Sequence, residues 1–119
     1  MATNITSTAL EAAITAAIVS ELNPNCKLAF YTIANVELAT LTGGTATADA
    51  GTSPDQVGIT GLVDDTAESG DVNYAVLTDA SDAEILRFTD PVNDIGLSNG
   101  TFTLGDTISL TSLAVAVPV

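Results

Sequence analysis

Acidic side chains in two predicted turns are the main candidates for chemistry in this chain. The first group is Asp64, Asp65, Glu68 and Asp71, and the second is Asp79, Ser81, Asp82 and Glu84. Oxygen ligands with this close spacing can bind Ca²⁺. Neither group follows the EF-hand pattern, and Asp and Ser are common in turns because they hydrogen-bond nearby backbone. We therefore interpret both groups as solvated turns and predict no metal requirement.

Other catalytic groups are scarce. The chain has no histidine, no tryptophan and one cysteine, Cys26. Because no histidine can serve as its base, Cys26 is interpreted as a small buried apolar residue rather than a nucleophile. Gly43 and Gly44 have no phosphate-loop lysine nearby. We predict a protein that is not an enzyme, with no catalytic, cofactor-binding or metal-binding residues and no cofactor.

Charge is strongly biased towards acids. Fifteen acidic residues stand against two basic residues, Lys27 and Arg87, for a net charge of −13. Such a surface repels phosphates and anionic lipids, so we expect no nucleic-acid and no membrane partner. Solubility alone explains the acidity, and a partner with a basic face is the alternative. We predict that Lys27 is solvated and that Arg87 pairs with an acid on a neighbouring strand.

One helix is expected near the start of the chain, over residues 8–22. Thr8 and Glu11 fit a capping box, apolar residues then recur at helical spacing, and Pro24 follows the pattern. We expect residues 1–7 to be a flexible N-terminal arm. The remaining residues, 8–119, are predicted to form a single β-rich domain, because their number is close to the commonest domain size.

The rest of the chain alternates between strand and turn signals. Residues 79–82 form the loop of the clearest hairpin, whereas residues 42–56 lack periodicity and are predicted to be a long surface loop. Strands are predicted at 27–33, 36–41, 57–63, 72–78, 83–89, from Phe102, and at 107–117.

The last predicted strand changes phase. Ile108 and Leu110 share one parity, and Leu113 and Val115 share the other. A regular strand cannot direct both pairs to one side. We therefore predict an interruption at 111–112, as a bulge or as a crossing between two sheets.

The fold class follows from these elements. Short strands of alternating polarity with one helix predict a mainly β protein, with an antiparallel β-sandwich or barrel-like sheet and one short N-terminal helix. The predicted core is Leu28, Phe30, Val72, Tyr74, Val76, Leu86, Phe88, Ile108 and Leu110.

Four segments in a fixed order resemble a known family. They read KLAFYT at 27–32, LATL at 38–41, VLTDASDAEIL at 76–86 and GDTISLTSL at 105–113. Together they resemble the small virion structural proteins of tailed phages, of the head decoration (cement) type. The segments span most of residues 8–117.

The resemblance implies a function. It implies a phage virion structural protein, most simply a head decoration protein on the outer capsid surface that stabilises capsomer junctions. The implied partners are the major capsid protein or another virion protein, together with copies of the chain itself, with a trimer favoured. The expected contact elements are the arm 1–7 and the loop 42–56. The alternative is a tail or fibre-associated module that binds a host surface or a carbohydrate.

Overall fold

The computed structural model describes residues 7–49, 56–97, 100–110 and 112–116. Within these ranges the chain forms two helices, α1 (Thr8–Leu22) and α2 (Pro91–Asp94), and ten strands. The strands are β1 (Cys26–Tyr31), β2 (Glu37–Asp49), β3 (Gln56–Thr60), β4 (Asp65–Thr66), β5 (Gly70–Asp71), β6 (Tyr74–Thr78), β7 (Glu84–Phe88), β8 (Thr101–Phe102), β9 (Thr107–Ile108) and β10 (Ser112–Ala116).

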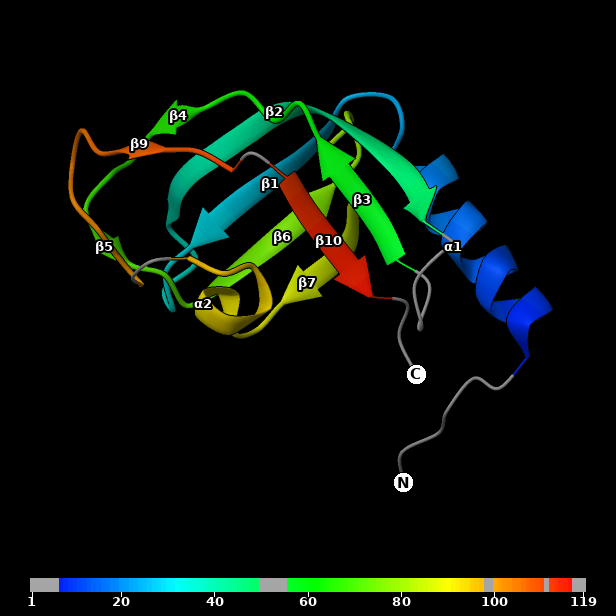
Figure 1. The fold of residues 1–119 in the computed structure, drawn as a ribbon. Coiled ribbons are helices and arrows are strands. Elements are labelled where there is room, and N and C mark those ends of the chain that lie inside the picture. The colour runs from blue at the N-terminus through cyan, green and yellow to red at the C-terminus, as the bar shows by residue number, and fades with distance from the viewer. Residues whose placement is uncertain (1–6, 50–55, 98–99, 111, 117–119) are drawn as a thin grey trace.

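Six of the strands build one antiparallel sheet that curves into a half-barrel, in the order β10-β3-β2-β1-β6-β7. Two small sheets, β4-β9 and β5-β8, are added to it. Figure 1 shows α1 beside the end of β2 at one end of the sheet and the β4-β9 pair at the opposite end. The predicted class, mainly β with a barrel-like antiparallel sheet and an N-terminal helix, is confirmed.

Helix α1 covers the predicted residues, but its cap lies one residue earlier than predicted. The Ser7 hydroxyl accepts a hydrogen bond from the Leu10 amide at 3.2 Å, which satisfies one free N–H of the first turn. Thr8 is therefore the first helical residue rather than the cap. The helix packs on β2, β3 and β7 through one side only, since Leu22 is buried whereas Leu10 is 51% exposed.

Asn23 joins the end of α1 to the sheet. Its backbone amide donates to the Val19 carbonyl at 3.1 Å. Its side-chain Nδ2 donates to the Ala46 carbonyl at 2.8 Å, and its Oδ1 accepts from the Ala46 amide at 2.9 Å. Ala46 lies in β2 and is 2% exposed. The Asn23 side-chain amide therefore satisfies its backbone N–H and C=O groups, as the backbone of a neighbouring strand would.

We expect Asn23→Ala to lower the free energy of unfolding by about 1–3 kcal/mol, because it leaves two buried backbone groups of Ala46 without partners. Urea melts measure the change. Asn73→Ala, at an exposed asparagine, is the matched control and should change stability by less than about 0.5 kcal/mol. Equal losses in the two variants would contradict the bridging role of Asn23.

The core lies on the concave side of the sheet and is formed largely as predicted. Leu28, Phe30 and Phe88 are buried. Four further predicted residues are partly buried against the same cluster, namely Val72, Leu86, Ile108 and Leu110. Cys26 is also fully buried, as predicted for a small apolar residue.

The prediction of which β6 side chains face the core is wrong. Phe30 pairs with Ala75 and Leu28 pairs with Leu77, so Ala75 and Leu77 face the core. Tyr74 and Val76 therefore point to the opposite side of the sheet, although Val76 is buried there, at 6% exposure. The prediction assigned the larger side chains of this strand to the core, whereas the small Ala75 is fully buried there.

The loop predicted at 42–56 is also wrong over the part that the structure describes. Strand β2 continues to Asp49 and pairs with β3, with Thr45 opposite Thr60 and Ala48 opposite Val57. Small residues suit this part of the sheet because Gly44 lies directly against Cys26 and Leu62. Residues 50–55 lie outside the described residues.

The interruption predicted in the last strand is present as a crossing between sheets, but it lies before Ser112, which already pairs with Thr60 in β10. Strand β9 pairs with β4, whereas β10 pairs with β3 in the main sheet. The two segments therefore need different parities to reach the core. Thr111 itself lies outside the described residues.

Candidate functional site

The first acidic group is used partly for structure. The Asp65 carboxylate accepts hydrogen bonds from the Thr40 and Thr66 amides, both at 2.9 Å, and Asp71 accepts from the Thr101 hydroxyl at 2.8 Å. Asp64 and Glu68 are exposed. Across the part of the chain that the structure describes, no three acidic or thiol side chains come together as metal ligands.

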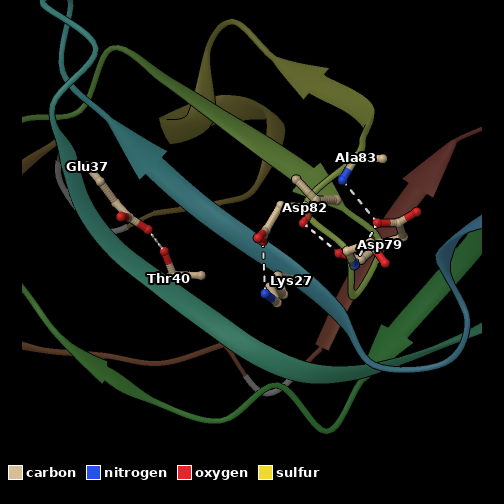
Figure 2. Close-up of polar contacts among 8 residues, drawn as sticks. Lys27, Glu37, Thr40, Asp79, Asp82 and Ala83 are labelled. Atoms are coloured by element: carbon tan, nitrogen blue, oxygen red, sulfur yellow. Dashed lines mark hydrogen bonds and ion pairs between the residues drawn. The ribbon is translucent and has the colours of Figure 1, made fainter.

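The second acidic group shapes the β6-β7 turn. Asp79 Oδ1 accepts from the Ser81 amide at 2.9 Å and from the Ala83 amide at 3.0 Å. The turn brings Asp82 to Lys27, whose Nζ donates to Asp82 Oδ1 at 2.9 Å (Figure 2). The prediction that Lys27 is solvated is wrong, because the turn lies beside the start of β1.

Arg87 also differs from its prediction. Its guanidinium donates to both carboxylate oxygens of Glu84, at 2.7 and 3.3 Å, so its acid lies on the same strand and not on a neighbouring one. This hydrogen bond lowers the pKa of Glu84. The guanidinium carbon also lies 4.6 Å from the centre of the Tyr74 ring on β6, a cation–π contact.

The two tyrosines of the chain form a stack in the same region. Tyr31 on β1 lies directly opposite Tyr74 on β6. Their ring centres are 5.1 Å apart and their planes differ by 11°. The Tyr74 hydroxyl donates to Asn35 Oδ1 at 2.7 Å, which holds the ring in place. A guanidinium and two rings are thus stacked across three neighbouring strands.

These contacts define one surface, which we call the outer face of the sheet. It consists of the residues of β1, β2, β6 and β7 that point away from the core. Both cations and both tyrosines of the chain belong to it. Its members are Lys27, Ala29, Tyr31, Glu37, Thr40, Tyr74, Val76, Thr78, Glu84 and Arg87.

A cavity of about 260 Å³ opens on the outer face over β1, bordered by β2, the end of β6 and the β6-β7 turn. Within it the Thr40 hydroxyl donates to Glu37 Oε1, and Figure 2 shows these two side chains meeting above β2. Burial raises the pKa of Tyr31, and the Glu37 carboxylate raises it further. The lining residues are Lys27, Ala29, Tyr31, Glu37, Thr40, Thr78 and Asp82.

The cavity is equipped for binding. It offers two carboxylates, two threonine hydroxyls, one aromatic ring and the Lys27 ammonium, which is paired with Asp82. The thiol of Cys26 is buried under the sheet, where burial raises its pKa. The side chains that line the cavity offer apolar contact, charge and hydrogen bonding.

Within the described parts of the predicted contact elements, Ser7 and residues 42–49 do not belong to this face. Residues 1–6 of the arm lie outside the described residues, and Ser7 serves as the helix cap. The predicted loop is strand β2 up to Asp49. The sequence did not predict the outer face, because the single indication of it was the alternation of side chains in β1, which places Lys27 and Tyr31 on the side opposite to Phe30. The partner strand and its register were needed to add Tyr74.

Comparison with family models, with characterised proteins and with solved structures finds no match to this chain. The resemblance to small tailed-phage proteins therefore stays a prediction. No helix in the described ranges has the length and apolar character needed to cross a bilayer.

Proposed function

We propose that this chain is a structural protein of a tailed-phage virion, a head decoration protein that binds the outer capsid surface and stabilises capsomer junctions. The observation that supports it is the composition of the outer face. Tyrosine and arginine are the residue types most enriched where protein interfaces gain their energy. Tyr31, Tyr74 and Arg87 form one stacked group there.

Charge supports the outside of the particle over the inside. A net charge of −13 repels packaged DNA and attracts a basic protein surface. Such complementarity raises the association rate and selects the partner. The proposed partner is the major capsid protein or another virion protein.

The proposed mode of action is multivalent. As a homo-oligomer, with a trimer favoured, the protein contacts several capsid subunits at once. Each contact raises the effective concentration of the next. Because the oligomer binds the assembled shell and not its separated subunits, it favours the shell by mass action.

One observation favours a second candidate, a tail or fibre-associated module that binds carbohydrate or a host surface. Sugar sites commonly place a ring beside hydroxyl and carboxylate groups. The cavity places Tyr31 beside Thr40, Thr78 and Glu37.

Particles prepared with and without this protein test the proposal. We expect particles without it to lose integrity at lower temperature and under milder osmotic shock, because no bound decoration protein then stabilises the assembled shell. Light scattering and DNA release measure the loss, and adding the purified protein back should restore stability. A copy number comparable with that of the capsid subunits is also expected. Equal stability combined with failure to adsorb to host cells would overturn the decoration proposal and support the second candidate.

A further inference from the structure

We infer that the cavity on the outer face is a slot for an arginine side chain of a protein partner. The inference deepens the proposed function and rests on it for the identity of that partner. The slot itself is defined by Tyr31 and Glu37, with Thr40 beside them.

The first argument is the free face of the Tyr31 ring. A ring has two faces, and Tyr74 covers the one towards β6. The strand order β2-β1-β6 places the other face towards β2. The cavity extends to that side, since the β2 residues Glu37 and Thr40 line it and Tyr74 does not. Thr78 of β6 and the Lys27–Asp82 ion pair line the rest of it.

The second argument is that the molecule already contains the arrangement that an incoming arginine would make. At the other end of the stack, Arg87 lies over the ring of Tyr74 and holds both oxygens of Glu84. Tyr31 and Glu37 repeat the ring and the carboxylate, without the guanidinium. A partner arginine would complete the same arrangement on the opposite side of the two-ring stack.

The third argument is charge. Lys27 is paired with Asp82 and Arg87 with Glu84, so the two basic side chains of the chain are already engaged. Glu37 accepts a hydrogen bond from the uncharged Thr40 hydroxyl, which orients its carboxylate. Among the described residues, no basic side chain is left without an acidic partner for Glu37, and a chain of net charge −13 attracts a cation from another molecule.

Arginine fits the slot better than lysine does. Its planar guanidinium stacks on an aromatic ring while its N–H groups reach a carboxylate with two parallel bonds. Lysine presents a compact charge without a flat surface. The slot therefore selects between the two basic side chains by shape and hydrogen-bond geometry, since both carry the same charge.

The peptide acetyl-Gly-Arg-Gly-amide is the probe, titrated into the full chain and followed by amide NMR at fixed ionic strength. We expect saturable shifts centred on Tyr31, Glu37 and Thr40, with weaker binding of the lysine peptide and none of the alanine peptide. Glu37→Gln and Tyr31→Leu should each weaken binding about tenfold, because each removes one of the two charge-dependent contacts.

Glu68→Gln is the matched control, since it removes the same charge from an exposed carboxylate that does not line the cavity. It should leave the affinity unchanged. Spectra of the free variants verify folding. If Tyr31→Leu does not fold, the affinity of Glu37→Gln for the arginine peptide tests the slot by itself. Shifts that do not saturate, or an equal loss in Glu68→Gln, would overturn the slot.

Methyl glucoside, titrated in the same way, separates the alternatives. Binding of the sugar at Tyr31 without binding of the arginine peptide would overturn the slot and support a carbohydrate module. The peptide titration uses no particles, so its failure leaves the decoration proposal standing. Unchanged stability of particles that lack the protein would overturn that proposal and leave the slot intact.

Discussion

Replacing Phe30 by alanine should lower the free energy of unfolding by about 3–5 kcal/mol. Phe30 is fully buried in β1, at the centre of the concave side of the sheet. Its ring meets the Phe102 ring edge-on, with centres 5.5 Å apart and planes at 70°. The substitution removes the apolar surface of the ring and leaves a cavity that a close-packed core closes only in part. Denaturant melts, fitted with one dependence of the unfolding free energy on denaturant concentration for both proteins, measure the loss.

Two companion variants test the cause. Ile33→Ala, at a side chain that is 81% exposed, should change stability by less than about 0.5 kcal/mol. Phe102 lies in β8, outside the main sheet, so the Phe30–Phe102 contact ties the β5-β8 pair to the core. A double-mutant cycle of the two phenylalanines should give a coupling of about 0.5–1.5 kcal/mol. A loss below about 0.5 kcal/mol in Phe30→Ala would contradict the core position of β1.

Replacing Gly44 by alanine should lower the free energy of unfolding by about 1–3 kcal/mol, although it adds a single methyl group. A Cβ at this position would lie 2.7 Å from Cys26 Sγ and 2.8 Å from Leu62 Cδ2. Cys26 and Leu62 are both buried, so these side chains or the backbone of β2 have to shift within a close-packed core. The change in urea midpoint measures the effect.

Gly58→Ala is the matched control for this prediction. Gly58 lies in the adjacent strand β3, where the nearest atom to an added Cβ is Thr47 Oγ1 at 3.6 Å, an ordinary contact. This variant should gain about 0.5 kcal/mol, because alanine loses less backbone freedom than glycine on folding. Gly44→Ala should also cost less in a Cys26→Ala background, which removes the nearest atom. An equal cost in both backgrounds would show that the thiol is not the obstacle.

Local patterns predicted the elements of the fold well. The helix over 8–22, the 79–82 hairpin and the break before Ser112 all depend on the order of residues within one segment. They are visible in caps, turn residues and parity. Strand β1 was placed correctly for the same reason, with Leu28 and Phe30 on the core side.

The errors share another origin. Continuing β2 through Gly43 and Gly44 depends on β3 and on the packing of Cys26, neither of which is local to residues 42–49. Residues with weak strand preference form a strand when neighbouring strands and packing stabilise them. The parity of β6 failed similarly, because the register with β1 buries Ala75 in spite of its small size.

The sequence by itself determined the class of the protein: a mainly β chain, strongly acidic, with no histidine, and with Tyr31 opposite in parity to Phe30. Only the tertiary structure decided the candidate site. The pairing of β1 with β6 stacks Tyr31 on Tyr74, and the pairing of β1 with β2 opens the cavity beside Glu37. Strand order and register are set by packing between segments distant along the chain, and a pattern within one segment carries no information about which strand will lie beside it.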